Sequence, residues 1–475
     1  MKKRSRFILV PMVIIILILN NTNTFAVSDV LEKAPNKLDA STVLTDCGKT
    51  FGGSQQDEIW GENALLATND NGYIITGGTE SFGNRKECLP YSCTIPWIVK
   101  TDADRNILWK RTIGDDIVYA IEASYVYQTS DNGFLIAITF EYPGFWNALV
   151  DFELIKIDSS GNIQWAKNFR DEQDSVNVLD SIVTDNEGNV ASMSLDGTDY
   201  YLSHIEEMID GNFDLLITTQ ANGGGWSDIR KVRIDTKGNI ISSNIFDGNG
   251  LGWAEYVSKT NDGGFIVADN RRSTISDDEI DCAEGAHENF RVLKYNNNGK
   301  KIWQREFCTD TYKNVKQIIP SRSNGHFVTG DTGSNNVSWE CKEELNCSNV
   351  WVIKLDSKGE VLWDMSFGEE YNETPMAALN THDDGIIIAA LEEPYVDKEN
   401  CSSHTQCGNT VITKINSQGE MSWQRKVVGN KYHNPSAMIH SSDDGIVIAG
   451  NAMLYGYDGS DIWLMKLNSQ GDCVW

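Results

Sequence analysis

Apolar and polar residues alternate along most of this chain in short runs that end at turns containing Gly. One phrase recurs seven times, with apolar, Lys, apolar and Asp or Asn positions, a tight turn that usually contains Gly, and then Trp. The copies read IVKTDADRNILW, LIKIDSSGNIQW, KVRIDTKGNIIS, VLKYNNNGKKIW, VIKLDSKGEVLW, ITKINSQGEMSW and LMKLNSQGDCVW. They end at positions 109, 165, 242, 303, 363, 423 and 475, all of which are Trp except Ser242. A spacing mostly close to 60 residues predicts one small sheet unit that is copied and stacked.

Each unit contains four strand signals. Two apolar runs flank a hairpin turn such as Asp383-Asp384-Gly385, and a variable segment then leads to the Lys-bearing strand. A tight turn such as Ser357-Lys358-Gly359 joins it to the Trp-bearing strand. The hairpin turn recurs at Asp70–Gly72, Asp131–Gly133, Asn186–Gly188, Asp262–Gly264, Ser323–Gly325 and Asp443–Gly445. With no helical periodicity, the pattern predicts an all-β, seven-bladed β-propeller with four antiparallel strands per blade over residues 43–475.

The two ends of the propeller complement each other. The seventh copy stops at Trp475, whereas the other copies continue beyond this position. The missing half occurs near the start of the chain, because Lys49–Gly52 matches Arg111–Gly114. We therefore expect Cys47–Phe51 to lie beside or complete the outer strand of the last blade, and a Cys47–Cys473 disulfide to lock this closure.

The third copy contains extra residues. In most copies the hairpin Gly lies 22–24 residues after the preceding Trp, and Gly188 lies 23 residues after Trp165. This spacing predicts Val178–Leu195 as the first hairpin of the third blade and an extra hairpin inserted at about 196–228. An eighth blade is the alternative, but the extra stretch has no Lys-strand and Trp-strand pair of its own.

These repeats resemble the roughly 60-residue propeller repeats of exported and cell-surface bacterial proteins. The likeness is carried by Lys49–Gly53, Asn71–Thr79, Asp262–Ala268 and Trp351–Trp363, and it covers residues 44–475. The resemblance implies the propeller fold. It implies no activity, because that family has none in common and a fold alone does not define a function.

The N-terminus has the pattern of a secretory signal. A basic stretch with Lys2 and Arg6 precedes the apolar run Phe7–Leu19, and the small-residue exit Thr24–Ala26 follows. We expect a signal peptide over residues 1–26, cleaved near Ala26, an N-terminal linker over 27–42, and a secreted or cell-surface protein. A membrane anchor, the alternative, needs about 20 apolar residues. No later segment is apolar enough to span a bilayer.

The chain is acidic. Its formal net charge is −28, and loss of residues 1–26 would remove four positive charges and leave −32. This charge argues against nucleic acid or anionic lipid as a partner, because phosphate binding needs clustered Lys and Arg. It permits cations or basic partners, and it also suits the solubility of an extracellular surface.

Ten cysteines suit an oxidising destination. Three pairs occupy the same segment of their repeats, and we expect each to close a local loop: Cys88–Cys93, Cys341–Cys347 and Cys401–Cys407. Cys282 occupies the first position of such a pair without the second, and Cys308 is its expected mate. Cys47 and Cys473 remain for the closure.

Repetition separates structural features from candidate chemistry. Asp102–Asn106 resembles a calcium loop, but its equivalents in other copies are plain tight turns. Gly-x-x-x-Trp also occurs in quinone-cofactor dehydrogenase propellers, but the adjacent cysteines of those enzymes are absent here. A sialidase would need three converging arginines, and the few clustered arginines, Arg271-Arg272, give little support for one. No His-x-x-x-His or Cys-x-x-Cys metal spacing and no Gly-x-Ser-x-Gly elbow occurs. The sequence thus predicts no cofactor, no metal and no catalytic residue.

The segments between the second and third strands differ from copy to copy. They comprise Glu80–Pro96, Glu141–Asp151, Asp196–Asp228, Asn270–Asn289, Thr332–Asn349, Glu392–Asn409 and Ala452–Ser460. In a propeller these loops emerge on one face, and variable loops on a rigid scaffold usually carry binding. The candidate ligand-binding residues in them are Trp146, Trp226, Trp339, Tyr395, Tyr455 and Tyr457. Exposed Trp and Tyr are typical anchors for proteins and sugar rings, although each ring can instead cover its own loop.

Three functions fit these observations. The first is a non-enzymatic, monomeric scaffold that binds an extracellular protein or glycan through its disulfide-braced loops. The second is an extracellular polysaccharide hydrolase or lyase with paired carboxylates in the central funnel, supplied by loops of blades 3, 4 and 6. The third is a structural role at the cell surface. We favour the first.

Overall fold

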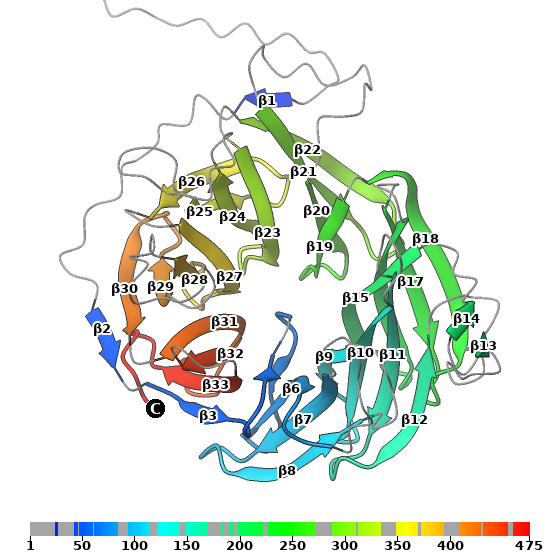
Figure 1. Ribbon diagram of the computed structural model, residues 1–475. Helices are drawn as coiled ribbons and strands as arrows, with labels where there is room; N and C mark the ends of the chain where they lie inside the picture. The colour runs from blue at the N-terminus through cyan, green and yellow to red at the C-terminus, as the bar shows by residue number, and fades with distance from the viewer. Residues whose placement is uncertain are drawn as a thin grey trace, which may run out of the picture.

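Seven four-stranded antiparallel sheets stand around one axis in the computed structural model of the protein (Figure 1). The structure describes residues 24–26, 42–45, 47–59, 61–83, 94–113, 121–142, 149–168, 183–184, 190–192, 198–221, 227–251, 253–270, 287–309, 312–333, 348–368, 372–393, 408–428, 431–454 and 459–475. Strands and turns make up these residues, and none of them belongs to a helix that could cross a membrane. The predicted seven-bladed β-propeller is confirmed.

The first four blades are built as follows, from the innermost strand outward. Blade 1 contains β4 (Asp57–Glu58) and β5 (Leu65–Ala67) as a divided inner strand, then β6 (Tyr73–Thr79), β7 (Ile95–Thr101) and β8 (Ile107–Thr112). Blade 2 contains β9 (Ile121–Gln128), β10 (Phe134–Tyr142), β11 (Leu149–Ile157) and β12 (Ile163–Asn168). Blade 3 contains β15 (Thr198–Glu207), β16 (Phe213–Ala221), β17 (Ser227–Ile234) and β18 (Ile240–Leu251). Blade 4 contains β19 (Trp253–Lys259), β20 (Phe265–Asn270), β21 (His287–Tyr295) and β22 (Lys301–Thr309).

The remaining blades follow the same plan. Blade 5 contains β23 (Tyr312–Pro320), β24 (His326–Gly333), β25 (Asn349–Leu355) and β26 (Val361–Phe367). Blade 6 contains β27 (Asn372–Asn380), β28 (Ile386–Glu393), β29 (Asn409–Ile415) and β30 (Met421–Val428). Blade 7 contains β31 (Lys431–His440), β32 (Ile446–Leu454), β33 (Ser460–Leu467) and, from the other end of the chain, β3 (Lys49–Phe51). Two short strands add to outer edges in parallel, β1 (Thr24–Ala26) on β22 and β2 (Thr42–Thr45) on β30.

The third blade differs from the sequence-based prediction. β15 and β16 form its inner half, so residues 198–221 are a regular blade hairpin and not an insertion. The extra residues precede this hairpin, at 169–197, and contain the separate two-stranded sheet of β13 (Val183–Thr184) and β14 (Val190–Ser192). A hairpin does lie within Val178–Leu195, as β13 and β14, but its assignment to blade 3 was wrong, and so was the predicted insertion at 196–228.

The extra residues explain this error. They move the true hairpin of blade 3, which has Asn212 where the other blades have Gly, beyond the usual spacing from Trp165, and Gly188 has that spacing. The turn Gly has a structural role in a blade such as blade 4, where a Cβ on Gly264 would lie 2.1 Å from Tyr295 O and 2.6 Å from Lys294 Nζ. Blade 3 has Arg233 at the Lys position, and its side chain pairs with Asp210 at 2.6 Å.

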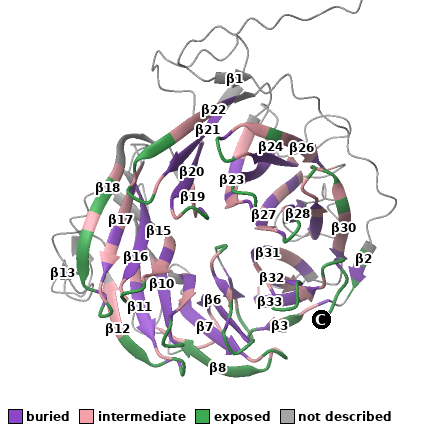
Figure 2. Ribbon diagram, turned by 180° about the vertical axis from the view of Figure 1, so that it is seen from behind, coloured by how far each residue is buried: buried purple, intermediate pink, exposed green. Residues whose placement is uncertain are grey.

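The hydrophobic core lies between neighbouring blades. The second and third strands are covered on both faces, and every residue of β6 and β7 is buried (Figure 2). Outer strands such as β8 are mostly exposed. The cluster between blades 1 and 2 joins Ile74 and Ile98 to Phe134 and Ile136. Because each blade buries one such interface on each side, the ring does not depend on one large central core.

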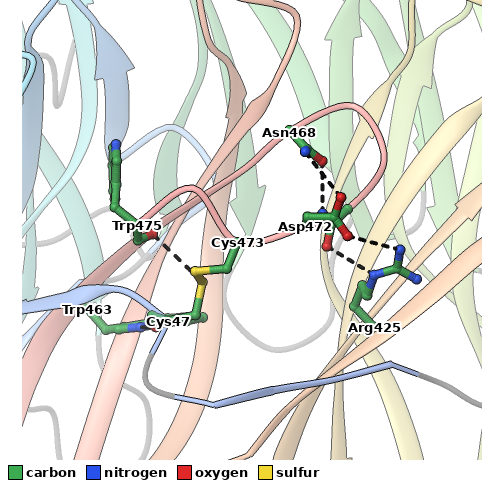
Figure 3. Close-up of a disulfide and its surroundings, with 8 residues drawn as sticks. Cys47, Arg425, Trp463, Asn468, Asp472, Cys473 and Trp475 are labelled. Atoms are coloured by element: carbon green, nitrogen blue, oxygen red, sulfur yellow. Dashed lines mark hydrogen bonds and ion pairs between the residues drawn. A yellow bond between two sulfur atoms is a disulfide. The ribbon is translucent and has the colours of Figure 1, made fainter.

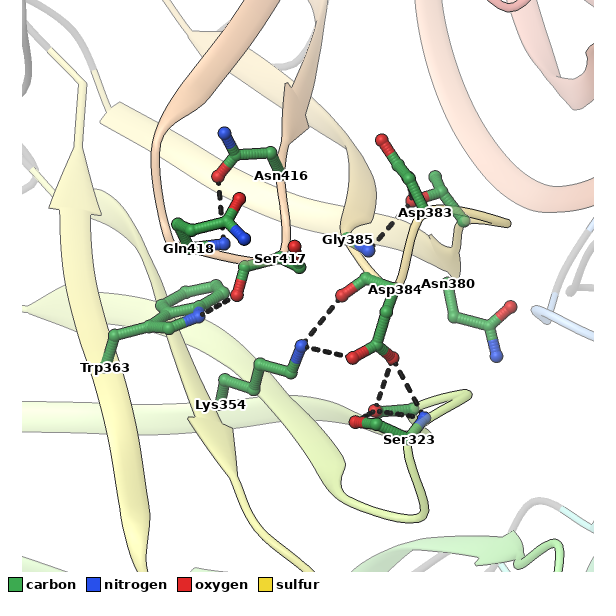
Figure 4. Close-up of polar contacts among 12 residues, drawn as sticks. Ser323, Lys354, Trp363, Asn380, Asp383, Asp384, Gly385, Asn416, Ser417 and Gln418 are labelled. Carbon is green, nitrogen blue, oxygen red and sulfur yellow. Dashed lines mark hydrogen bonds and ion pairs between the residues drawn. The ribbon is translucent and has the colours of Figure 1, made fainter.

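In five blades a lysine on the third strand fixes the hairpin turn of the same blade. Its ammonium group lies beside the turn Asp at 2.7–3.1 Å in five blades: Lys100–Asp70, Lys156–Asp131, Lys294–Asp262, Lys414–Asp383 and Lys466–Asp443. In blade 5 the turn has Ser323 in place of this Asp, and Lys354 binds Asp384 of blade 6 instead, at 2.7 Å (Figure 4). The recurring Lys is therefore a structural residue, and in blade 5 it joins two blades.

In most blades a tryptophan of the outer strand docks on the following blade. Its Nε1 donates to a carbonyl of the next tight turn in five cases, Trp109 to Ser159, Trp165 to Thr236, Trp303 to Ser357, Trp363 to Ser417 and Trp423 to Ser469, at 3.0–3.3 Å. The ring packs against the turn Gly, which has φ near +80°, and a Cβ on Gly419 would lie 2.8 Å from Trp363. In blade 3 the Trp position is Ser242, and Phe246 contacts Gly299 in its place.

At the closure of the ring, residues from the two ends of the chain together form the outer strand and its docking contact (Figure 3). β3 pairs with β33 in antiparallel fashion, and Cys47 forms the predicted disulfide with Cys473. Trp475 stacks on Arg105 of blade 1, with the guanidinium carbon 4.2 Å from the ring centroid. Lys49 Nζ donates to the carbonyl of the same Arg105 at 3.0 Å. The C-terminal end of the chain thus supplies the docking residue Trp475, and the N-terminal end supplies the basic residue that follows it, Lys49. In blade 6 a single strand carries both, as Trp423 and Arg425.

A buried histidine leads to a prediction about the stability of the protein in acid. His326 is 2% exposed and occupies a position that is Phe in blades 2, 3 and 4. Burial, helped by the charge of Lys294, lowers its pKa from 6.5 to about 4. Between pH 6.5 and 4 the unfolded chain therefore binds a proton at this histidine and the folded chain does not. The free energy of unfolding falls as the pH falls through this window.

We expect His326→Phe to remove this term. The free energy of unfolding lost between pH 8 and pH 5 should be smaller in the variant by about 2 kcal/mol. Urea titrations of both proteins at the two pH values measure the difference. An equal loss in the two proteins would mean that His326 is protonated without cost in the folded state.

Candidate functional site

The predicted ligand-binding aromatics all lie outside the described residues: Trp146, Trp226, Trp339, Tyr395, Tyr455 and Tyr457. The same holds for the cysteines Cys88, Cys93, Cys282, Cys341, Cys347, Cys401 and Cys407. Cys308 belongs to β22, but its side chain is not among those described. The roles of these residues and the four further disulfides remain predictions. The structure does show the strands at which their segments begin and end.

Those strands show that the variable segments start from one face of the ring. Hairpin turns of neighbouring blades touch each other, as where Asn69 N donates to Gln128 Oε1 at 2.9 Å and Asn380 Nδ2 donates to Pro320 O at 2.7 Å. All hairpin turns therefore share one face, which we call the turn face. The opposite ends of the second and third strands share the other face, which we call the loop face.

The connections on the loop face differ in length, whereas the turns on the turn face are uniform. Three connections are short, at 143–148, 222–226 and 455–459, and four are long, at 80–94, 271–286, 334–348 and 394–408. The connection of blade 3 is therefore much shorter than the predicted segment Asp196–Asp228. Variable length on one face of a constant scaffold is typical of binding surfaces.

Each long connection starts beside a buried carboxylate. The carboxylate of Asp57, which is fully buried, accepts hydrogen bonds from Ser81 Oγ at 2.7 Å and Gly53 N at 2.6 Å at the start of segment 80–94. Asp269 pairs with Arg291 at 2.6 Å across the ends of segment 271–286, and both residues are buried.

The other two long connections have the same kind of base. Asp331, which precedes segment 334–348, is largely buried and lies 3.9 Å from Lys316 Nζ. Burial raises the pKa of this carboxyl, against the opposing effects of Lys316 and Asn314. Glu392, which precedes segment 394–408, pairs with Lys426 and accepts a hydrogen bond from Asn409 Nδ2 at 2.9 Å. The long connections are thus attached to the scaffold through polar contacts that burial strengthens.

A second candidate feature lies at the axis and was not predicted from the sequence. The inner strands of blades 2, 3, 5, 6 and 7 each contain a bulge of one residue at the same level, for example Ser124 in blade 2. Blade 1 uses five residues, Ile59–Asn63, where blade 2 uses two, Ala123–Ser124. Among the described inner strands, this is the largest departure from the repeat.

Glu62 is the ionisable residue of this enlarged bulge. Gln317 of blade 5 donates from Nε2 to its Oε2. Glu62 is exposed, and so is its hydrogen bond from Gln317. Neighbouring protein atoms raise the pKa of Glu62, and the hydrogen bond from Gln317 opposes the rise. A carboxyl group at the axis that bonds a residue of a distant blade is a candidate for contact with a ligand.

Other side chains that the sequence brought forward have structural partners. Asn106 N and Nδ2 donate to the carboxylate of Asp102 at 2.8 and 3.0 Å, as Asn162 does to Asp158 at 2.9 Å. The turn that resembles a calcium loop is thus an Asx turn like its equivalents. In the part of the chain that the structure describes, no three His, Cys, Asp or Glu side chains are grouped so that they could hold a metal ion.

Comparisons with known proteins give only distant likenesses. No protein-family model matches the chain, and no curated protein matches it. Among solved structures, hydrazine synthase of Kuenenia stuttgartiensis superposes with a TM-score of 0.46 at 12% identity, over 90% of this chain and 100% of that one. Lignostilbene dioxygenase of Pseudomonas brassicacearum gives 0.48 at 12% identity over 89% and 92%, and the Pan2 WD40 domain of Neurospora crassa gives 0.42 at 9% over 85% and 88%. At these scores the likenesses carry no inference about function.

Proposed function

We propose that this protein is an exported scaffold that binds an extracellular protein or glycan through the loop face, without catalysing a reaction. The observation that carries the proposal is the contrast between the two faces. Repeated ion pairs and Trp contacts fix the turn face, whereas the loop face bears connections of differing length on buried polar supports. A rigid base lowers the entropy that variable loops lose when they bind a partner.

Export is supported by two independent features. The chain begins with the charge and hydropathy pattern of a signal peptide. Cys47 and Cys473 form a disulfide, and such bonds persist in oxidising compartments. The resemblance to repeats of exported and cell-surface bacterial proteins agrees with both.

Binding is tested most directly with two of the three Trp candidates. We expect Trp226→Ala combined with Trp339→Ala to weaken binding at least about tenfold, because buried aromatic anchors commonly contribute more than about 1 kcal/mol each. A glycan array and a pull-down from the surrounding medium, both with the chain that starts after Ala26, identify the partner, and titration of that partner measures the loss.

The matched control removes apolar surface from a different place. Leu108 and Leu362 are each 55% exposed on outer strands, and Leu108→Ala combined with Leu362→Ala should leave affinity unchanged. Equal affinity of the Trp variant and the original protein would place the site away from these loops. Release of reducing sugar ends during the glycan assay would contradict a binding-only role and support the hydrolase or lyase.

A further inference from the structure

Two short strands from the N-terminal part of the chain lie on the outer edges of two blades (Figure 1). β2 pairs in parallel with β30 of blade 6, where Leu44 lies opposite Val427, four residues after the docking Trp of that strand. β1 pairs in parallel with β22 of blade 4, where Phe25 lies opposite Phe307, again four residues after the docking Trp. The two added strands therefore occupy the same position on their blades.

The strand on blade 6 makes two kinds of contact at the junction with blade 7. Leu44 is 8% exposed and packs in one cluster with Val427 and with Trp463 of blade 7. Cys47, three residues after Leu44, accepts a hydrogen bond at its carbonyl from Trp463 Nε1 at 3.1 Å. The added chain thus covers the junction and pairs a buried donor of the next blade.

The junction between blades 4 and 5 has the same parts except for the acceptor. Phe307 and Trp351 belong to one hydrophobic cluster. Lys313 of the inner strand lies over the Trp351 ring, with Nζ 4.8 Å from its centroid. In blade 7 the equivalent residue is His433, whose ring centroid lies 4.7 Å from that of Trp463, so the two tryptophans have the same setting. Trp351 is 1% exposed, and its Nε1 has no hydrogen-bond partner among the described residues.

β1 does not supply this acceptor, and it belongs to the part of the chain that export is proposed to remove. It ends at Ala26, one residue after Phe25, whereas the acceptor Cys47 lies three residues after Leu44. Cleavage near Ala26 would release β1 and leave the edge of β22 unpaired. An unpaired strand edge is a template for another strand, and a buried N–H without an acceptor favours a ligand that brings one.

We infer that, in the exported protein, the outer edge of β22 is a docking site for an extended segment of a partner protein, which adds to it as a parallel strand. The inference rests on the proposed export, because the site opens only when β1 is removed. The segment places a bulky apolar side chain opposite Phe307 and, three residues later, a carbonyl at Trp351 Nε1. Main-chain bonds to the edge supply affinity, and the apolar residue supplies selectivity. The site continues the loop face, because the end of β22 pairs with the start of β21, where segment 271–286 ends.

A peptide of residues 22–30 of this chain is the probe, because it contains β1 and extends past the position expected to meet Trp351. We expect it to bind the protein collected from the medium. At a peptide concentration of about ten times Kd, the outward-facing amides among Glu306–Cys308 should exchange hydrogen about tenfold more slowly. The amides of Arg425–Val428, which β2 already covers, are the internal control and should not change.

Two substitutions test the two contacts separately, with the affinity measured by fluorescence anisotropy of the labelled peptide. Phe25→Ala in the peptide should weaken binding at least about tenfold, because it removes the apolar anchor. Trp351→Phe in the protein keeps a ring in the cluster and removes the donor, so it should weaken binding about fivefold, the effect of one neutral hydrogen bond. In the original protein the indole N–H signal of Trp351, identified by its absence from this variant, should move on binding. Equal affinity after either substitution would overturn the inference.

The mass of the secreted chain separates this inference from the proposed export. A chain that begins after Ala26 and does not bind the peptide would overturn the docking site and leave export intact. A secreted chain that keeps residues 24–26 would overturn the cleavage and, with it, the open edge. Full protection of Glu306–Cys308 in the cleaved chain without peptide would show that the chain itself or a second copy fills the edge, and would overturn docking of a partner.

Discussion

Replacing Cys47 and Cys473 together by Ser is expected to lower the midpoint of thermal unfolding by up to about 7 °C. The disulfide joins residues 426 positions apart, so it constrains almost the whole unfolded ring. The chain-entropy model gives about 6 kcal/mol for a loop of this size, as an upper value. An unfolding entropy of about 0.9 kcal/mol per kelvin for residues 43–475 converts this into the expected shift.

Scanning calorimetry of the oxidised protein and the double variant measures the shift. Val474→Ser is the matched control, because Val474 lies in the same closing segment, is 49% exposed and takes no part in the disulfide. It should change the midpoint by less than about 1 °C. A double variant as stable as the control would show that β3 and Trp475 close the ring without the covalent link, and peptide mapping of the unreduced protein would show whether Cys47 has another partner.

The closure could be predicted because the repeat itself contained the information. Lys49–Gly52 completed a phrase that Trp475 left unfinished, and two cysteines remained at the ends once the others were paired by register. The structure adds reasons that the sequence did not provide. Trp463 Nε1 donates to Cys47 O at 3.1 Å, and Gly48 has φ +111° with no room for a side chain beside the same ring.

The third blade was placed wrongly because extra residues precede its hairpin, and two of its marker residues are also changed. Asn212 replaces the Gly of the hairpin turn, and Ser242 replaces the docking Trp. Phe246, four residues further along, contacts Gly299 and stacks on Phe265 at 5.6 Å between centroids. The packing requirement is met by a different residue at a different position, and a motif search cannot detect such a substitution in advance.

The enlarged bulge of blade 1 was not predicted for a related reason. Glu62 lies in a stretch of blade 1 that resembles no other copy, so no repeat equivalent marks it. The signal was present, since an inner strand with three extra residues around a Gly must bulge where the other blades bulge by one. What could not be read from the sequence was that the bulge reaches Gln317, which lies 255 residues away in the chain.

The ion pair between Lys354 and Asp384 should carry the largest single-residue effect among the repeated turn contacts. Lys354 is 2% exposed, and its ammonium contacts both Asp384 Oδ2 at 2.7 Å and Asp384 O at 2.8 Å. Asp384 also accepts from Ser321 Oγ and Ser323 N in blade 5. Partial burial opposes ionisation of Asp384, but the hydrogen bonds from Lys354, Ser321 and Ser323 outweigh it and hold its pKa well below the usual range.

We expect Asp384→Asn to reduce the free energy of unfolding at pH 7 by about 3 kcal/mol, because it leaves the Lys354 ammonium buried without a counterion. Asp443→Asn is the matched control in the same repeat position as Asp383. Its carboxylate is 60% exposed, so loss of its pair with Lys466 should cost only about 1 kcal/mol or less. Urea unfolding of both variants measures the difference, and equal losses would show that Lys354 finds another partner or water.

The size of the effect should also depend on which partner is removed. Lys354→Met takes away the buried charge and leaves Asp384, which is 22% exposed, to the solvent and to its two Ser donors. It should therefore cost less than Asp384→Asn, since an uncompensated buried charge is worse than an apolar replacement of similar volume. Because the lowered pKa of Asp384 stabilises the folded chain above about pH 4 and is lost as the pH falls through the folded-state pKa, both variants should also lose less stability on acidification below pH 4 than the original protein. The opposite ranking at pH 7 would mean that the Lys354 side chain stabilises the blades mainly by packing, with its 5.1 Å approach to the Phe327 ring as the leading contact.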